Sequence, residues 1–246
     1  MPGLSRFFDV LARRGIRWAL LTNNSTATVN EYISRLAGFG IPARPEQVVT
    51  SAMATARRLS EVYPPGTAFY VIGERGIQAH LEEEGFTIYT GEVLPPQPVA
   101  AVVMGLDRSF GYRRLAVATR LVRNGAAFYA TNADATFPMP GGIAPGAGAL
   151  LAALIATTDR QPIVIGKPQP AIYEMALKQL NAPADTAVML GDRMDTDILG
   201  ARRFGIPALL VLTGVTRRED LARYDYQPDA VYDDISALAA ALEENV

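Results

Sequence analysis

The chain of 246 residues contains no cysteine and only one histidine, His80. The absence of thiols excludes disulfides, thiol catalysis and thiolate metal sites. A single histidine excludes a His-rich metal site and argues against a catalytic triad that depends on imidazole. Any chemistry in this chain therefore rests on carboxylates, lysines, hydroxyls and backbone groups.

Long apolar runs and an excess of charge are also lacking. No stretch approaches the roughly 20 apolar residues that span a bilayer, and residues 1–6 lack the apolar core of a secretory signal. The net charge of −2 offers no strongly basic surface for nucleic acid or an anionic membrane. We therefore expect a cytoplasmic protein with neither nucleic acid nor membrane as a partner.

Short apolar strands alternate with amphipathic helices along the chain. This alternation predicts an α/β fold with a mainly parallel sheet. Segment 132–148 is rich in proline and glycine, so we expect a loop over at least part of it. We expect strands at 17–21, 68–72, 99–104, 127–130, 162–165, 187–190, 208–212 and 230–232, and helices at 4–14, 29–38, 52–61, 77–84, 112–124, 149–156, 171–180, 196–204 and 236–242.

Thr22, Asn23, Asn24 and Ser25 follow the first expected strand. A hydroxyl and several backbone N–H groups at the end of a strand, before a helix, suit a phosphate or another anion. The alternative is an Asx-type turn that caps the next helix, because turns use the same residue types. Taken alone, the segment favours the turn.

Two further strand ends carry charged residues. Lys167 lies between a strand and a helix, where it can bring a positive charge to an oxyanion, although most single lysines are simply exposed.

Asp192, Asp195 and Asp197 follow another strand. Clustered carboxylates suit Mg²⁺, whereas N-capping by Asp195 or Thr196 and pairing of Asp197 with the helix dipole is the alternative. Capping explains Asp195 well and Asp192 poorly.

In this order, the three motifs resemble the second, third and fourth motifs of the haloacid dehalogenase (HAD) superfamily of phosphohydrolases. Thr-Asn-Asn-Ser, Gly-Lys-Pro and Gly-Asp-Arg-Met-Asp-Thr-Asp-Ile look most like its NagD-like and p-nitrophenylphosphatase-like subfamily. Segments 103–107, 130–132 and 145–146 also look like that subfamily. The resemblance implies a HAD-like Rossmannoid core, 1–50 and 167–246, with an inserted α/β cap domain, 51–166.

The resemblance also implies roles for individual residues. Thr22 and Lys167 would be catalytic, and both would bind the substrate phosphate together with Asn23 and Asn24. Asp192 would be a ligand of the Mg²⁺ cofactor.

Asp197 would lie behind the metal ligands or orient Lys167. The expected substrate is a small phosphorylated metabolite, such as a sugar phosphate or a nucleotide. Residues Asn132, Asp134, Phe137 and Met139 of the cap would reach toward it. Dimers formed through the cap are common in similar proteins, so a homodimer is a further expectation.

One family motif is absent from the sequence. In the family, Asp-x-Asp-Gly ends the first, central strand and supplies the nucleophile and the general acid and base. No Asp-x-Asp-Gly occurs among the 246 residues. We therefore expect that the central strand is missing, that the true start lies upstream or the sequence is truncated, and that this form of the phosphatase is inactive. The alternative is a catalytically dead relative that binds phosphate ligands or partners.

Overall fold

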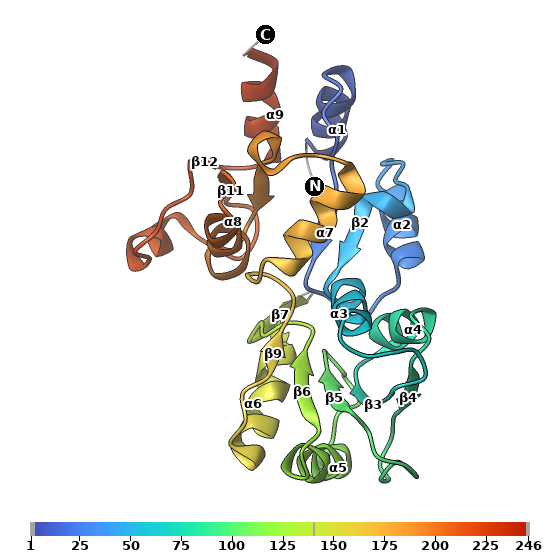
Figure 1. Cartoon of the computed structure of the whole chain (residues 1–246). Helices are drawn as coiled ribbons and strands as arrows, with labels where there is room; N and C mark the ends of the chain where they lie inside the picture. The colour runs from blue at the N-terminus through green and yellow to red at the C-terminus, as the bar shows by residue number, and fades with distance from the viewer. Residues whose placement is uncertain (1–2, 140, 245–246) are drawn as a thin grey trace. The chain divides into compact units, whose positions relative to one another are not determined.

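The computed structural model describes residues 3–139 and 141–244, which form two compact units (Figure 1). Unit 1 comprises residues 1–20, 32–48 and 167–246, and unit 2 comprises 21–31 and 49–166. The cap predicted from the sequence, 51–166, lies within unit 2, which also includes residues 21–31 and 49–50. The assignment of 21–31 to unit 2 was not indicated by the sequence. The chain passes between the units near β1 (Leu20–Thr22), α2 (Val29–Gly38) and β2 (Val48–Thr50).

Unit 1 is built on a three-stranded parallel sheet in the order β10-β11-β12. Met189 pairs with Ala208, and Leu209 with Ala230. The strands are β10 (Met189–Gly191), β11 (Ala208–Val211) and β12 (Ala230–Tyr232), and the helices are α1 (Leu4–Arg13), α7 (Ala171–Leu180), α8 (Leu199–Phe204) and α9 (Ile235–Glu244). Short 3₁₀ turns span Pro45–Gln47, Ala184–Thr186 and Arg218–Arg223.

Helices α1 and α9 pack against each other and bury an apolar cluster. Phe7 and Leu11 from α1 meet Leu238 and Ala239 from α9, and Leu190 of β10 borders the cluster. Apolar side chains three to four residues apart lie on one face of a helix, which is why these residues share one interface.

Unit 2 contains a five-stranded, fully parallel sheet in the order β4-β3-β5-β6-β9. Its strands are β3 (Ala68–Ile72), β4 (Thr87–Tyr89), β5 (Ala101–Met104), β6 (Ala127–Ala130) and β9 (Ile163–Val164). Its helices are α3 (Ser51–Ser60), α4 (Arg75–Glu83), α5 (Tyr112–Arg123) and α6 (Ala147–Thr158).

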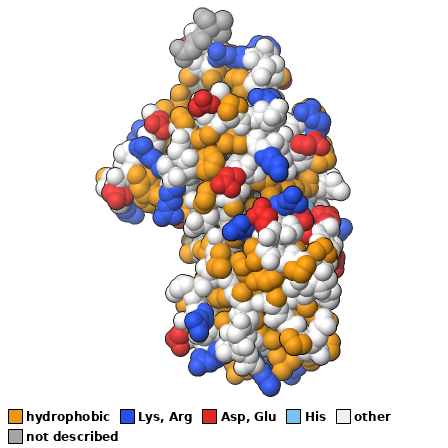
Figure 2. Space-filling model, in the orientation of Figure 1, with side chains coloured by type: hydrophobic (Ala, Val, Ile, Leu, Met, Phe, Trp, Pro, Cys, Tyr) orange, Lys and Arg blue, Asp and Glu red, His pale blue; other side chains and the backbone are white. Residues whose placement is uncertain are grey.

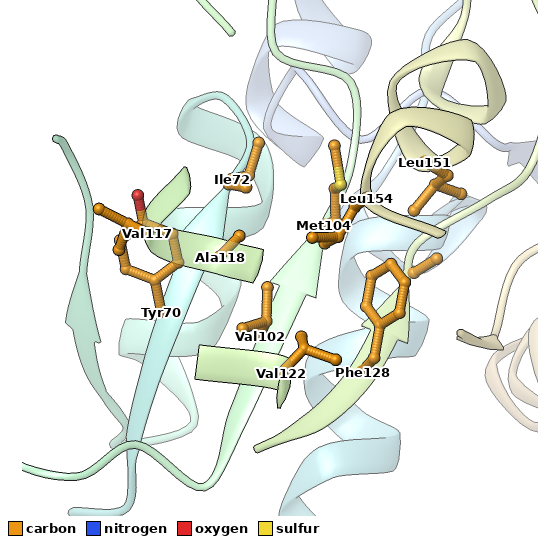
Figure 3. Close-up of a cluster of buried hydrophobic side chains, with 11 residues drawn as sticks. Tyr70, Ile72, Val102, Met104, Val117, Ala118, Val122, Phe128, Leu151 and Leu154 are labelled. Carbon is orange, nitrogen blue, oxygen red and sulfur yellow. The ribbon is translucent and has the colours of Figure 1, made fainter. Parts of the chain in front are cut away.

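Alternate residues of the unit 2 strands face opposite sides of the sheet. Tyr70, Val102 and Phe128 lie in one buried cluster with side chains of α5 and α6 (Figure 3). Phe69 is also fully buried and contacts the rings of Tyr63 and Phe86. Both sides of the central strands are therefore covered, as is usual for parallel sheets.

The proline- and glycine-rich segment 132–148 is more regular than expected. It contains an antiparallel hairpin of β7 (Thr136–Met139) and β8 (Gly142–Pro145). Gly141 and Gly142 have φ of 87° and 153°, backbone conformations that glycine adopts without a steric cost. A connecting loop is therefore an incomplete description of this segment.

No helix in the described part of the chain is long and apolar enough to cross a membrane. Lys and Arg side chains are interspersed with Asp and Glu on the face shown in Figure 2, in keeping with a net charge of −2.

Candidate active site

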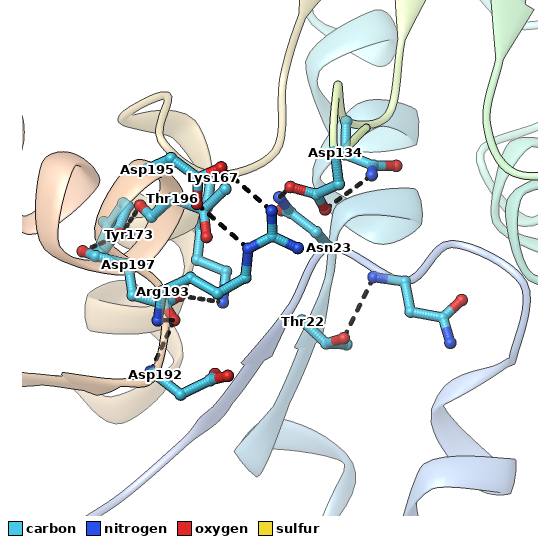
Figure 4. Close-up of polar contacts among 12 residues, drawn as sticks. Thr22, Asn23, Asp134, Lys167, Tyr173, Asp192, Arg193, Asp195, Thr196 and Asp197 are labelled. Atoms are coloured by element: carbon cyan, nitrogen blue, oxygen red, sulfur yellow. Dashed lines mark hydrogen bonds and ion pairs between the residues drawn. The ribbon is translucent and has the colours of Figure 1, made fainter. Parts of the chain in front are cut away.

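The turn after β1 is held by its own side chains. Thr22 Oγ1 accepts a hydrogen bond from the backbone N–H of Asn24 at 3.1 Å (Figure 4), and Asn24 Oδ1 accepts one from the N–H of Thr26 at 3.0 Å. The Asx-turn interpretation therefore holds for Asn24. The turn does not cap the next helix, because Thr28 and Glu31 form the capping pair of α2. The Thr22 hydroxyl donates to no residue in the described part of the chain, so its proton is available to a ligand.

Asn23 lies in the same turn and is 8% exposed. Its Nδ2 donates to Asp134 Oδ1 at 3.4 Å, and its backbone oxygen accepts from Ser51 Oγ at 2.7 Å. Asp134 also accepts from Asn132 Nδ2 at 2.9 Å. The segment after β6 therefore supports the turn, which is a role that the sequence did not indicate for Asp134.

Phe137 and Met139, the other two cap residues singled out in the sequence, belong to strand β7. Phe137 is half-buried and Met139 is exposed.

Lys167 is buried, with 8% of its surface exposed, so the alternative of a solvated surface lysine is wrong. It lies before α7 and is joined to Pro168 by a cis peptide bond. Its Nζ is 2.7 Å from Asp197 Oδ1 (Figure 4), in an ion pair whose angle falls outside hydrogen-bond geometry. A buried charge needs such a partner, since an unpaired ion in the interior costs several kcal/mol or more.

Asp197 belongs to a π-helical turn, Met194–Ile198, that precedes α8. Its Oδ2 accepts from the backbone N–H groups of Asp192 and Arg193, at 3.1 Å each. A Cβ on Gly191 would lie 2.3–2.4 Å from the Asp197 side chain, so only glycine leaves room for this carboxylate. Asp197 therefore links the buried lysine to the loop after β10.

The expectation that Asp195 or Thr196 caps the helix is wrong. The N-cap position is Arg193, without a side-chain capping bond. The Asp195 carboxylate instead accepts two bonds of 3.1 Å from the Arg193 guanidinium. The residue type of Asp195 alone favours helix capping. In the structure its carboxylate binds the Arg193 guanidinium instead, because that group offers two charged N–H donors.

Asp192 follows β10 directly. Its Oδ2 accepts from the N–H of Val215 at 2.8 Å, and its backbone oxygen accepts from the N–H of Thr216 at 3.0 Å. A Cβ on Gly214 would lie 1.9 Å from Asp192 Oδ2, so the chain comes very close here. Within the described residues Asp192 Oδ1 has no hydrogen-bond partner, which leaves one carboxylate oxygen open.

The loop after β11 orients this aspartate, a role that was not predicted from the sequence. Thr216 Oγ1 also accepts from the N–H of Met194 at 3.2 Å. The sequence pattern of this loop is not distinctive, because glycine and threonine, here Gly214 and Thr216, are ordinary turn residues at a strand end.

The fit to Mg²⁺ rests on this open oxygen. The described residues contain no group of three or more Asp, Glu, His or Cys side chains that would hold a metal by itself. Mg²⁺ is commonly bound by one or two carboxylates, with water and substrate phosphate completing its octahedron. Asp192 fits the place of one such carboxylate, whereas Asp197 and Asp195 are already bonded to Lys167 and Arg193.

Tyr173 supports the π-helical turn from α7. Its hydroxyl lies 3.3 Å from the carbonyl oxygen of Thr196 and 3.2 Å from that of Asp197, and donates to them. Burial raises the pKa of the Tyr173 phenol, and the charge of Asp197 raises it further. The phenol therefore stays protonated and remains a donor.

Comparisons with known proteins point to the same family as the Thr22, Lys167 and Asp192 motifs. Residues 1–87 match the model of haloacid dehalogenase-like hydrolases, and residues 164–238 match the HAD-hydrolase-like model. The acid sugar phosphatase of Staphylococcus haemolyticus is 38% identical over 245 residues, which cover 100% of this chain and 91% of the relative. The chain belongs to the HAD family.

Solved structures of HAD phosphatases have the same fold. A 4-nitrophenylphosphatase from Thermotoga maritima is 32% identical with a TM-score of 0.89, covering 98% of this chain and 90% of the other. A glycerol phosphate phosphatase from Mycobacterium tuberculosis, solved in complex with magnesium, is 33% identical with a TM-score of 0.85, covering 94% and 69%. The predicted fold class and the predicted enzyme class, a HAD-type phosphatase, are confirmed.

Proposed function

We propose that this HAD phosphatase, when an Asp-x-Asp-Gly strand supplies its nucleophile, hydrolyses phosphomonoesters of small metabolites and that its reaction depends on Mg²⁺. The observation that carries the proposal is the buried pair of Lys167 and Asp197, bonded through Asp197 to the backbone beside Asp192. A sugar phosphate is the first candidate substrate, because the curated relative from S. haemolyticus is an acid sugar phosphatase. Glycerol phosphate is the second, because the M. tuberculosis neighbour is a glycerol phosphate phosphatase.

Each residue has a physical role in this proposal. Lys167 presents a fixed positive charge to the phosphoryl oxygens, and Asp197 keeps the ammonium in place so that little reorganisation is needed. The Thr22 hydroxyl donates a hydrogen bond to a phosphoryl oxygen, and Asn23 and Asn24 form the rest of the phosphate-binding turn. Asp192 is one ligand of Mg²⁺, which when bound would neutralise charge on the phosphate.

The nucleophile of HAD phosphatases is the first aspartate of an Asp-x-Asp-Gly motif. The 246 residues contain no Asp-x-Asp-Gly, so we propose that this form of the chain forms no aspartyl-phosphate and gives no turnover. A catalytically dead relative that binds phosphate is the second candidate function, favoured by the same absence.

A hydrolysis assay separates the two candidates. Mg²⁺-dependent release of p-nitrophenol from p-nitrophenyl phosphate is measured for the 246-residue chain and for a form extended at its N-terminus with an Asp-x-Asp-Gly strand from a relative. We expect no turnover from the first and EDTA-sensitive turnover from the second. An inactive extended form that binds phosphate favours the catalytically dead relative, and full activity of the 246-residue chain overturns our assignment of the nucleophile.

Two aspartates offer a matched pair for the metal role. In the extended form, Asp192→Asn is expected to lower kcat at least about 100-fold, because an amide is a poor ligand for Mg²⁺. Asp195→Asn removes a neighbouring carboxylate that is bonded to Arg193, and we expect less than a threefold change. Equal effects of the two substitutions would argue against Asp192 as the specific ligand.

A homodimer formed through the cap is a further part of the proposal. Unit 2 exposes the large apolar side chains of Val93, Tyr112 and Ile143. Multi-angle light scattering of the purified chain measures the mass, and a monomer at all concentrations would contradict the dimer.

A further inference from the structure

The strand order of the unit 2 sheet points to a crevice. Taken in chain order its five strands run 2-1-3-4-5, and all are parallel. Open sheets of this order bind ligands beyond the carboxyl ends of the strands, where the direction of winding reverses. That point lies between β3, which ends at Ile72, and β5, which ends at Met104.

The crevice is filled by a segment of the same chain. The backbone N–H of Gly76 donates to the carbonyl oxygen of Thr26 at 3.0 Å, and the N–H of Ile77 donates to that of Ser25 at 3.1 Å. These N–H groups belong to the first turn of α4, which has nine residues. Such groups have no partner inside their helix and commonly bind an anion. Here two of them bind the backbone of 25–26 instead.

The fit of this segment is tight. A Cβ on Gly76 would lie 2.5 Å from the Ser25 carbonyl oxygen and 2.6 Å from that of Ala27. A Cβ on Gly105, the residue after β5, would lie 2.5 Å from Ser25 Oγ. Ser25 is fully buried, and its Oγ accepts from Thr131 Oγ1, after β6, at 3.1 Å. Glycines therefore stand where the incoming segment touches the ends of α4 and β5.

The segment continues directly from the turn of Thr22, Asn23 and Asn24. The same edge of the sheet also holds Asn23, through Asp134. The turn is thus fixed to structure that follows β3, β5 and β6.

We propose that the unit 2 sheet acts as the positioning scaffold of the phosphate-binding turn. Residues 25–27 occupy the ligand crevice of this sheet, and Ser25 is a positioning residue for Thr22 and Asn23. The phosphate role of the turn rests on the proposed function, whereas the occupation of the crevice does not. A sheet whose crevice is filled in this way holds no second ligand at that point, so its contribution is to keep the turn in one conformation.

Gly105→Ala tests the inference, because the added methyl group would meet Ser25 Oγ. We expect hydrogen exchange of the Gly76 and Ile77 amides to accelerate at least about tenfold, relative to the Ala127 amide at the opposite end of the sheet. Gly105→Ala/Ser25→Ala removes that hydroxyl and should exchange more slowly than Gly105→Ala, close to the rate of Ser25→Ala alone. Gly111→Ser is the control, since a Cβ there meets nothing within 4 Å, and it should leave both amides unchanged.

Binding of inorganic phosphate, measured by calorimetry on the same proteins, completes the test. We expect Gly105→Ala to weaken phosphate binding about fivefold or more and the double variant to recover part of the loss. Unchanged exchange of Gly76 and Ile77, or an equal rise at Ala127, overturns the inference. If Gly105→Ala does not fold, Ser25→Ala alone, which deletes the bond to Thr131, is expected to accelerate the same amides, and no acceleration overturns the inference.

A further variant separates this inference from the proposed function. If Thr22→Val leaves phosphate binding unchanged while the exchange results are as expected, the phosphate role of the turn fails and the packing stands. If Thr22→Val weakens binding but Gly105→Ala changes neither exchange nor binding, the positioning role fails and the proposed function stands.

Discussion

Lys167 and Asp197 place opposite charges side by side in an environment that excludes most water. Their side chains are 9% and 5% exposed, and the carboxylate also accepts two backbone N–H groups. Ion pairs at the surface contribute little to stability. A buried pair behaves differently, because removal of one partner leaves the other charge without compensation.

Lys167→Met is therefore expected to lower the free energy of unfolding by about 3–5 kcal/mol. Urea denaturation monitored by circular dichroism measures the change. The double variant Lys167→Met/Asp197→Asn should recover part of the loss, because it no longer buries a lone carboxylate. A double variant less stable than the single one would contradict this account.

A glycine beside Asp197 provides a second prediction at this scale. In Gly191→Ala the new Cβ would overlap a carboxylate that is held on both oxygens, so we expect a loss of about 1–3 kcal/mol in the free energy of unfolding. Gly38→Ala is the matched control. Gly38 is helical, and a Cβ there meets nothing within 4 Å, so urea denaturation should show no loss or a small gain in stability.

At the residue scale, the sequence identifies the polar residues but not their partners. Thr22, Lys167, Asp192 and Asp197 stand out because they follow apolar strands. The ion pair of Lys167 and Asp197 joins residues 30 positions apart, and local spacing does not encode such a pair. Asp195 was misjudged for the same reason, since its preference for an N-cap is overridden by Arg193.

Whole elements were predicted best where burial repeats with a clear period. The expected strands 68–72, 127–130 and 230–232 and the expected helices 29–38 and 171–180 match β3, β6, β12, α2 and α7 residue for residue. The hairpin of β7 and β8 was not predicted because Pro138 and Pro145 argue against a strand. Pro145 lies opposite Thr136 and Pro138 opposite Ile143, and two isolated strands, which are both edge strands, tolerate proline. Strands β2 and β4, of three residues each, were not predicted.

The pairing of α1 with α9 yields a prediction at the element scale. Leu238 is 3% exposed and packs in the cluster with Phe7 and Leu11. Leu238→Ala should therefore lower the free energy of unfolding by about 2–4 kcal/mol, through lost burial and a cavity. Urea denaturation measures it, and Leu242→Ala, at the partly buried border of the cluster, should cost less. Equal losses would show that the two helices are not held by this cluster.

At the scale of the whole molecule, two partly buried tyrosines make the free energy of unfolding depend on alkaline pH. Burial and a hydrogen bond with Tyr129 raise the pKa of Tyr63 in unit 2 from 10 to about 12. Burial and nearby Tyr224, Asp195 and Asp225 raise the pKa of Tyr226 in unit 1 to about 12. The folded chain thus keeps protons that the unfolded chain releases above pH 10.

The free energy of unfolding is therefore expected to fall between pH 10 and 12, and the tyrosine contribution is fully present below pH 10. Urea midpoints measured from pH 8 to 11.5 follow the change. Tyr63→Phe and Tyr226→Phe should each make the fall shallower, because each removes one such proton. A midpoint that stays constant over this range would contradict the shifted pKa values.

Strand β10 carries a consequence for the handling of the purified protein. In the described part of the chain it pairs with β11 alone, so it is an edge strand, and Val188 just before it is 53% exposed. Unpaired backbone beside an exposed apolar side chain is a template on which a strand from another molecule adds. Concentrated solutions should therefore lose soluble protein over time, visible as rising turbidity, and storage in dilute form should slow that loss.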